Sequence, residues 1–237
     1  MNVGIVGSGY VGTTVAACFA ELGHRVTNVD VDESVVETIE AGQSPVDEPR
    51  LDELLARHGG DRLRATTDYT ALRDTDAVFL ALPTPSNEDG SVDPSYLQAG
   101  AESLGAVLTA GEYPVVAVKS TVVPGVVEER VLDALESASG LVAGEDFGLT
   151  TNPEFLREGS AVDDFLDPDK VVFGTMDGDD RSLDRLRAVF DPLVERSDAA
   201  VVETGTREAM MIKYANNAFL AAKVSLINEL GNVCKEY

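Results

Sequence analysis

The chain has 237 residues, of which 44% are hydrophobic, so it is long enough to bury the core of one large α/β domain. Its 42 acidic residues outnumber 18 basic ones and give a net charge of −24, which argues against nucleic acid and anionic membranes as partners because both are polyanions. No apolar run of about 20 residues and no basic, apolar leader stands out, and we therefore expect a soluble, cytoplasmic protein.

The acidic residues are scattered over predicted helices and loops. Such a surface resembles that of proteins from salt-loving organisms, in which high ionic strength screens the self-repulsion. Two cysteines cannot support a disulfide framework, and Cys18 stands in an apolar helical segment where a small core residue is expected. The sequence suggests no metal site.

The first predicted elements are a strand, a glycine-rich turn and a helix. Residues 3–6 favour a buried parallel strand and residues 13–22 the helix. Between them, Gly7 would permit the tight turn, Gly9 would let the backbone approach a pyrophosphate, and Gly12 would let helix and strand pack closely. The free N–H groups at the start of the helix favour a bound anion. Because glycine-rich turns are common, the spacing alone also fits a simple turn.

An acidic residue after the next strand extends this pattern. Residues 26–29 predict that strand, and it ends in Asp30, where a ribose-binding acid is expected. A carboxylate there accepts hydrogen bonds from the adenosine 2′-hydroxyl and repels a 2′-phosphate, so NAD is favoured over NADP. Asp32 and Glu33 are alternative residues for this role, and an acid solvated at a strand end is the alternative interpretation.

Strands and helices alternate along the rest of the chain, which predicts an α/β fold with a doubly wound, mostly parallel sheet. Asp93 and Pro94 predict the start of a helix that runs to about Ala110, and Pro124-Gly125 predicts another that ends near Ser139. The other predicted strands are residues 63–65, 77–82, 114–118, 147–150, 171–174 and 199–203, and the other predicted helices are residues 33–41 and 51–57.

Ligands of such sheets bind beyond the carboxyl ends of the strands, and the distinctive polar segments of this chain fall there. The coincidence of position is stronger evidence than any one segment. These segments are residues 7–12, Asp30, residues 83–85, Ser120-Thr121 and residues 152–158.

The segment of residues 152–159 predicts a short helix. Asn152 can cap it, Pro153 suits its first position and Gly159 can end it, so that Glu154 and Glu158 would share one face. Two neighbouring carboxylates repel one another and can shift in pKa, which is useful for proton transfer. The alternative is a pair of acids that only stabilise the helix start and face solvent.

Residues 206–237 predict one helix about 45 Å long. It is apolar on several faces, so we expect it to pack against a further domain, a second subunit or both. Lys213 and Asn217 are polar residues one turn apart on this helix, and a buried lysine needs a partner. Of the few lysines, Lys119 and Lys170 also stand beside the polar segments named above.

Taken together, these motifs resemble the nucleotide-sugar (UDP-glucose/GDP-mannose) dehydrogenase family, and its UDP-glucose members most closely. The resemblance implies a Rossmann-like NAD-binding domain over residues 1–204 and a long helix over residues 205–237 that begins a central domain and joins two subunits in a homodimer. The motifs that carry it are the glycine turn with Tyr10-Val11, Pro83-Thr84-Pro85, residues 120–125, residues 152–159, residues 213–217 and Asn228-Glu229.

The resemblance implies a double oxidation, in which two NAD molecules take the C6 alcohol of a UDP-sugar, UDP-glucose above all, to a carboxylate. The residues implied in NAD binding are Gly7, Gly9, Tyr10, Val11, Gly12, Asp30, Pro83, Thr84, Ser120, Thr121 and Glu158.

Catalytic and substrate-binding roles are implied in the same way. Thr121 and Glu158 would position water, substrate and nicotinamide, and Glu154 would take part in proton transfer or hydrolysis. The ammonium group of Lys213 and the amide of Asn217 would stabilise oxyanions at C6. Along the substrate would lie Phe155 and Leu156, together with Glu154, Lys213 and Asn217. No catalytic role is expected for Lys170, which stands where the family often has arginine.

The family's catalytic cysteine belongs to a part of its pattern that follows residue 237. Cys234 lies about 30 Å from Lys213 along one predicted helix, so it cannot substitute within a subunit. We therefore expect an N-terminal portion of such an enzyme, either truncated or half of a split protein, that binds NAD but does not oxidise the sugar alone.

Three alternatives remain open on the sequence. UDP-N-acetylmannosamine and GDP-mannose dehydrogenases share these N-terminal motifs. A dehydrogenase that performs a single oxidation on a small hydroxy acid also sets a lysine and an asparagine on a helix after its cofactor domain. The last alternative is a non-enzymatic NAD-binding module that dimerises through the terminal helix.

Overall fold

The computed structural model describes residues 1–109, 111 and 113–236. The strands are β1 Asn2–Val6, β2 Arg25–Val29, β3 Leu63–Thr66, β4 Ala77–Leu80, β5 Val115–Val118, β6 Gly148–Thr151, β7 Lys170–Thr175 and β8 Ala200–Gly205. The α-helices are α1 Tyr10–Glu21, α2 Glu33–Glu40, α3 Leu51–His58, α4 Ser95–Gly105, α5 Leu132–Ser139, α6 Ala161–Leu166, α7 Asp180–Val194 and α8 Thr206–Glu236. A 3-10 turn, η1 Tyr69–Leu72, and a π-helical turn, η2 Val127–Val131, complete the series.

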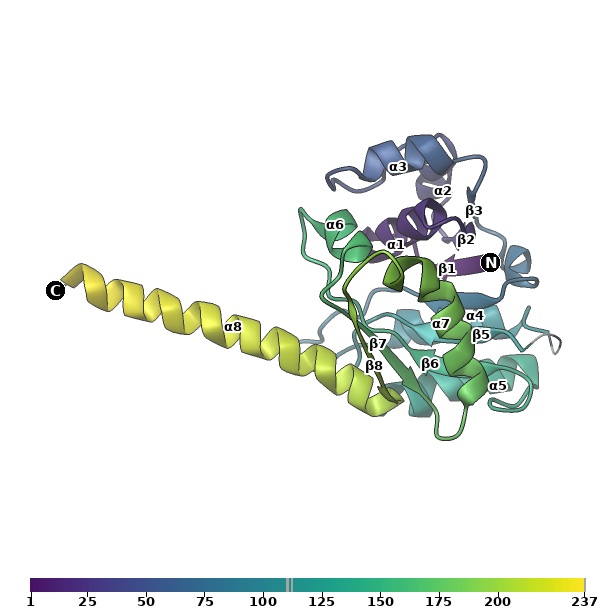
Figure 1. The fold of residues 1–237 in the computed structure, drawn as a ribbon. Coiled ribbons are helices and arrows are strands. Elements are labelled where there is room, and N and C mark those ends of the chain that lie inside the picture. Colours follow the sequence, from purple (N-terminus) through teal and green to yellow (C-terminus); the bar gives the residue numbers. More distant parts are fainter. Residues whose placement is uncertain (110, 112, 237) are drawn as a thin grey trace.

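The strands of the described residues form one sheet of eight in the order β3-β2-β1-β4-β5-β6-β7-β8 (Figure 1). Neighbouring strands are parallel except β6 and β7, which are antiparallel. The order runs outward from β1 in both directions, so the crossover helices lie on both faces. The predicted doubly wound, mostly parallel sheet is confirmed.

Two apolar clusters sandwich the sheet, because alternate residues of a strand point to opposite faces. In β5, Val115 and Ala117 face one cluster, while Val116 and Val118 face the other. The first cluster includes residues of α1, α3, α6 and α7, with the ring of Phe19 at edge-on contacts to its aromatic neighbours. Cys18 is fully buried in this cluster, as expected.

The glycine-rich turn joins β1 to α1 at close range. Gly7 has a φ of +98°, and a Cβ there would lie 2.6 Å from the carbonyl oxygen of Ala81. A Cβ on Gly12 would lie 1.9 Å from the carbonyl oxygen of Gly7. The backbone itself therefore requires glycine at positions 7 and 12, which fits the two predicted roles. The helix begins at Tyr10, three residues earlier than the sequence predicts.

The structure differs from the predicted elements at several points. Residues 152–157 follow β6 without helical structure, so the predicted short helix is wrong. The helix α4 ends at Gly105, and the predicted end at Ala110 lies outside the described residues. Chain segments 161–166 and 180–194, which the sequence analysis left unassigned, form α6 and α7.

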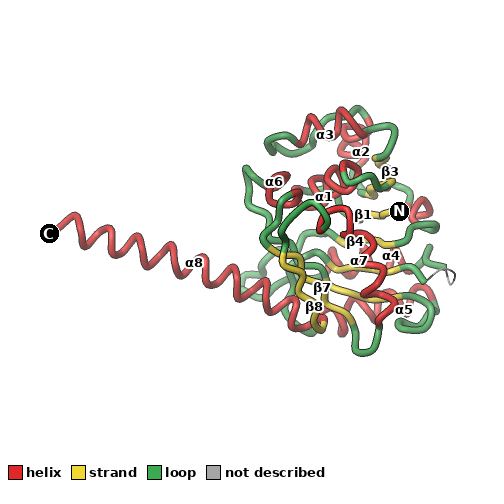
Figure 2. The backbone as a smooth tube through the Cα atoms, viewed as in Figure 1, coloured by secondary structure: helices red, strands yellow, loops and turns green. Residues whose placement is uncertain are grey.

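The last helix, α8, extends away from the sheet (Figures 1 and 2). Its first turns pack against β6, β7 and β8, and the last buried side chain is Lys213. Its later apolar side chains are exposed in the chain taken alone, so the expected packing against a further domain or a second subunit stays a prediction. These side chains are Phe219, Leu220, Val224, Leu226, Ile227, Leu230 and Val233. Among the described residues, no helix combines the length and apolar character that crossing a membrane requires.

A buried lysine lies directly after β5. Lys119 is 3% exposed, and its Nζ lies 5.9 and 5.8 Å from the ring centroids of Phe79 and Phe165. The same ammonium group donates a 2.8 Å hydrogen bond to Oδ1 of Asn152. Burial, opposed by the Glu154 carboxylate and assisted by the Lys213 ammonium group, lowers the pKa of Lys119 from 10.5 to about 8.

This pKa predicts a pH window for stability. Below about pH 8 both the folded and unfolded chains hold the Lys119 proton, so folding bears the cost of burying the charge. Between pH 8 and 10.5 only the unfolded chain holds it, and rising pH therefore favours folding. The free energy of unfolding of the natural chain should rise relative to Lys119→Met by up to about 3 kcal/mol across this window.

Urea unfolding of both proteins at intervals from pH 7 to 10.5 measures this difference, and the other titrations cancel in it. Lys223→Met is the control, because Lys223 is exposed on α8. A difference that stays flat with pH for Lys119→Met would refute the prediction.

Candidate functional site

Two cavities meet at the carboxyl ends of β1, β4, β5 and β6. One, the glycine-turn cavity, contains most of the predicted NAD-binding residues. It is lined by Gly9, Tyr10, Val11, Ala81, Leu82, Pro83, Thr84, Lys119, Ser120, Thr121 and Glu154. Three lining residues were not among those predicted to bind NAD. They are Ala81 and Leu82, which follow β4, and Lys119, which was predicted only to lie beside the polar segments.

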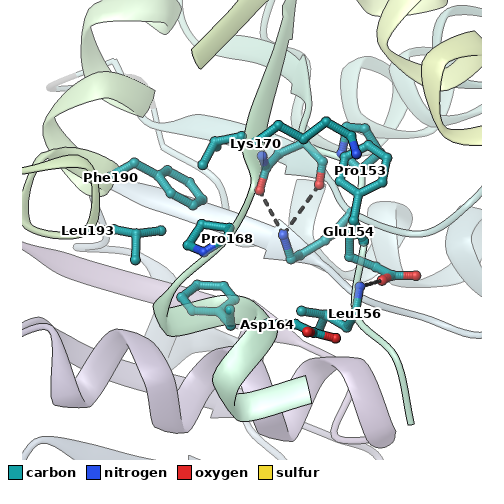
Figure 3. Close-up of a pocket in the computed structure, with 13 residues that line it drawn as sticks. Pro153, Glu154, Leu156, Asp164, Pro168, Lys170, Phe190 and Leu193 are labelled. Atoms are coloured by element: carbon teal, nitrogen blue, oxygen red, sulfur yellow. Dashed lines mark hydrogen bonds between the residues drawn. The ribbon is translucent and has the colours of Figure 1, made fainter. Parts of the chain in front are cut away.

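The other cavity, the Phe155 pocket, lies under the loop of residues 152–159. Figure 3 shows Phe190 and Leu193 of α7 on one side of it and Glu154 and Leu156 on the other. Its lining also includes Lys119, Asn152, Pro153, Phe155, Asp164, Phe165, Pro168, Lys170 and Val171. Lys119, which follows β5, and Glu154, which comes after β6, line both cavities. One charged group from each of these two strand ends therefore lies where the cavities meet.

The glycine turn leaves room for a ligand at one position. Unlike its two neighbours in the motif, Gly9 has no atom within 4 Å of where a Cβ would stand. Gly9 is also the N-cap residue of α1, and it brings no side chain to the free amides of the first turn. Open space and uncapped N–H groups together suit an anionic group such as a pyrophosphate.

Asp30 lies beside this turn. Its Oδ2 accepts a 2.6 Å hydrogen bond from the Ser8 amide, and its Oδ1 accepts one of 3.0 Å from the Asp32 amide. Asp32 has a different task, since its carboxylate caps α2 through the Ser34 amide at 2.9 Å. The hydroxyl and amide of Ser34 lower the pKa of Asp32 through these bonds. The geometry therefore favours Asp30 over Asp32 as the ribose-binding acid.

Hydrogen bonds brace the wall opposite the glycine turn. The Ser120 hydroxyl accepts a 2.9 Å bond from the Leu82 amide and donates one of 2.7 Å to the Leu82 carbonyl. Thr84 donates its hydroxyl to the Thr121 carbonyl at 2.9 Å. Pro83 is thus held between two fixed neighbours, and the side chain of Thr121 remains free of these backbone bonds.

The side chain of Asn152 explains why residues 152–157 are not helical. Its Oδ1 accepts the bond from Lys119, and its Nδ2 donates a 2.9 Å bond to the Val172 carbonyl in β7. A capping asparagine would use that oxygen for an amide of its own helix. Instead, Glu154 turns the chain locally, because its Oε2 accepts a 2.5 Å bond from the Leu156 amide.

Glu154 and Lys213 form a nearly buried ion pair. Nζ of Lys213 lies 2.8 Å from Oε1 of Glu154, and their side chains are 6% and 15% exposed. Two ammonium groups lie near the ring of Phe155, whose centroid is 5.5 Å from Nζ of Lys213 and 4.2 Å from Nζ of Lys170. Charges at this distance and burial interact strongly, so the pair offers both a hydrogen-bond donor and a proton acceptor.

The structure separates the two predicted glutamates, whereas Lys213 and Asn217 keep their predicted spacing of one turn on α8 and differ in burial. Glu154 lies in the site, whereas Glu158 is exposed and does not share a helix face with it. Lys213 is buried, whereas Asn217 is exposed and accepts only a 3.4 Å bond from Asn216. Lys170 donates a 3.2 Å bond to Oδ1 of Asn216. Glu158, Asn217 and Lys170 are therefore not bonded to the Glu154–Lys213 pair in this structure.

Neither cysteine lies in the site. Cys18 is buried, and burial raises the pKa of its thiol, while Cys234 is exposed on α8. Among the described residues, no cluster of three or more histidine, cysteine, aspartate or glutamate side chains could hold a metal ion.

Comparison with known proteins places these features in a family. Residues 1–194 match the NAD binding domain of the UDP-glucose/GDP-mannose dehydrogenase family, and residues 207–237 match its central domain. UDP-glucose 6-dehydrogenase AglM of Haloferax volcanii is 55% identical over 239 aligned residues, which cover 100% of this chain and 55% of that protein. GDP-mannose 6-dehydrogenase of Pseudomonas aeruginosa PAO1 is 40% identical, over 99% of this chain and 53% of that protein.

Solved structures agree. A ternary complex of GDP-mannose dehydrogenase from Pseudomonas aeruginosa superposes with a TM-score of 0.92 at 38% identity, over 99% of this chain and 53% of that one. A UDP-glucose dehydrogenase from Pyrobaculum islandicum gives 0.87 at 42% identity, over 97% and 52%. The chain thus spans about half the length of the curated relatives it matches. The predicted resemblance and the predicted cofactor, NAD, are confirmed, and the chain belongs to the UDP-glucose/GDP-mannose dehydrogenase family.

Proposed function

We propose that this chain supplies the NAD site and part of the catalytic site for the four-electron oxidation of the C6 alcohol of a UDP-sugar, with UDP-glucose as the substrate. The observation that carries the proposal is the Glu154–Lys213 pair at the junction of the glycine-turn cavity and the Phe155 pocket. The 55% identity to a UDP-glucose 6-dehydrogenase supports the choice of sugar.

In this proposal the glycine-turn cavity holds NAD, which when bound accepts hydride from the substrate. The uncapped amides of α1 hold the pyrophosphate, Gly9 lets it approach, and Asp30 accepts hydrogen bonds from the adenosine ribose. Gly7 and Gly12 shape the turn, and Pro83, Thr84, Ser120 and Thr121 form the facing wall together with Tyr10 and Val11.

In this proposal Lys213 and Glu154 have separate roles at the C6 oxygen. Nζ of Lys213 donates a hydrogen bond to that oxygen and stabilises negative charge on it, and the buried position strengthens this interaction. Oε1 of Glu154 orients the ammonium group and accepts a proton from it or from water. Phe155 and Leu156 lie along the sugar. Asn217, which would stabilise an oxyanion at C6, and Glu158 are exposed in this chain.

GDP-mannose is the second candidate substrate. It is favoured by the 40% identity and the TM-score of 0.92 to GDP-mannose dehydrogenases. A diketoreductase structure and another solved structure, at 16% and 14% identity, support the fold alone.

The role of Asp30 gives the first test. Asp30→Ala should weaken NAD binding by about 1.5 to 3 kcal/mol, because a charged hydrogen bond to the ribose is lost. Titration of the 237-residue chain with NAD measures the affinity. Asp32→Ala is the control, since it removes the cap of α2 at a cost of about 1 kcal/mol in stability and should leave the affinity unchanged. Equal affinity for Asp30→Ala and the natural chain would remove Asp30 from the site.

The oxidation itself is tested with a chimera of residues 1–237 and the second half of the Haloferax volcanii relative. UDP-glucose should yield two NADH per sugar and outcompete GDP-mannose, whereas the 237-residue chain alone should bind NAD and form no product. Lys213→Met should lower kcat by about 100-fold or more, and Lys223→Met, a change of the same kind at an exposed position of α8, should not. One NADH per sugar, or preference for GDP-mannose, would overturn the proposed reaction or substrate.

We also propose that the chain forms a homodimer through residues 206–237, because α8 leaves an apolar surface exposed beyond Lys213. Sedimentation should give a dimer at high and at low salt. Replacing Val224 and Ile227 with aspartate should convert it to a monomer, and Ser225→Asp, which adds charge at a polar position, should not. A natural chain that sediments as a monomer in both salts would contradict the dimer.

A further inference from the structure

A buried carboxylate outside the proposed catalytic residues joins three distant segments. Glu48 lies between α2 and α3 and is 5% exposed. Its Oε1 accepts a 2.7 Å hydrogen bond from the Ala161 amide, and its Oε2 accepts one of 2.9 Å from the Gly159 amide. The same Oε2 accepts a short hydrogen bond from the hydroxyl of Tyr10.

Each of the three donors belongs to a different part of the site. Tyr10 lies in the first turn of α1 and lines the glycine-turn cavity. Gly159 ends the loop that carries Glu154, and Ala161 begins α6. The Tyr10 hydroxyl also contacts the loop directly, at 3.2 Å from the Gly159 amide and 3.3 Å from the Arg157 carbonyl. The wall of the cofactor cavity and the loop therefore share one acceptor.

Electrostatics keeps this acceptor ionised. Burial acts to raise the pKa of Glu48, but the hydrogen bonds from Tyr10, Gly159 and Ala161 outweigh it and hold the pKa below its ordinary value. Burial and the neighbouring Glu48 raise the pKa of Tyr10, so the phenol remains a donor. The contact between a neutral hydroxyl and a buried carboxylate is thus maintained over the neutral pH range.

The loop has a second anchor at its other end. Asn152 is fixed to Lys119 and Val172, while the Arg157 amide and guanidinium bind Asp164 of α6. The anchor at the α6 end of the loop is connected through Glu48 to Tyr10. A ligand in the glycine-turn cavity would contact Tyr10. A shift of Tyr10 upon binding would therefore reach the loop at its Gly159 end.

We propose that Glu48 is a positioning residue that couples occupation of the glycine-turn cavity by NAD to the arrangement of the loop of residues 152–159. The link runs from Tyr10 through the Glu48 carboxylate to the amides of Gly159 and Ala161. The inference rests on the proposed NAD contacts and on the proposed role of Glu154. By linkage, the ordered loop also favours the bound cofactor by the same factor.

Hydrogen exchange with and without saturating NAD tests the coupling, with saturation of each protein checked by titration. In the natural chain, NAD should slow amide exchange in residues 155–161 by about fivefold or more. Glu48→Gln and Tyr10→Phe should abolish most of this NAD-dependent slowing. Tyr10→Phe removes one hydroxyl and keeps the ring, so it preserves the test if Glu48→Gln does not fold.

Glu40→Gln is the matched control. The Glu40 carboxylate also accepts a backbone hydrogen bond, from the Ala65 amide at 2.6 Å, but it has no contact with Tyr10 or the loop. Its substitution should leave the NAD-dependent slowing intact. If Glu48 only stabilised the structure, amide exchange would be faster in Glu48→Gln, but NAD would still slow it by the same factor. That result would overturn the coupling. Failure of the natural chain to bind NAD would instead refute the cofactor site on which the coupling depends.

Discussion

The hydrogen bond between Lys119 and Asn152 is the constraint on which the geometry of the site depends. It ties the end of β5 to the first residue after β6, and Asn152 passes the link on to β7. An ammonium group buried at 3% exposure is costly unless it is paired. Here an amide oxygen and two aromatic rings compensate it without a direct carboxylate partner. The loop therefore leaves the sheet in one direction, which places Glu154 at the junction of the two cavities.

The other charged groups of the site lie around Glu154. Its carboxylate bonds Lys213 on one oxygen and the Leu156 amide on the other, so both its oxygens are oriented. The ammonium groups of Lys170 and Lys213 both lie over the ring of Phe155. The ammonium groups of Lys119, Lys170 and Lys213 thus lie around the Phe155 pocket, together with the carboxylates of Glu154 and of Asp164, which is paired with Arg157. A site of this kind stabilises negative charge developing on a substrate oxygen better than a neutral one does.

The sequence was informative where the signal is local and less so where a partner is remote. The roles of Gly7 and Gly12 in the turn could be predicted because strand, turn and helix follow one another within a single unit, and the alternation of strands with helices predicted the sheet. The helix at residues 152–159 was predicted wrongly, because the local capping signal of Asn152 lost to a hydrogen bond from Lys119, 33 positions away. Glu48 was missed for the same reason, since its backbone donors lie 111 and 113 positions along the chain. Glu158 and Asn217 were singled out by their spacing from Glu154 and Lys213 on predicted helices, and the resemblance added their proposed roles.

The positive site also bears on how an anionic ligand approaches a chain with a net charge of −24. NAD and nucleotide sugars are anions, and the field of the whole surface repels them. Salt shortens the range of that field to about 8 Å at physiological ionic strength and about 3 Å at 1 M. Contacts within the cavity act at shorter distances and inside a lower dielectric, so they survive the screening. Concentrating Lys119, Lys170 and Lys213 at the carboxyl end of the sheet therefore lets an acidic surface and an anion site coexist, and more so as the salt concentration rises.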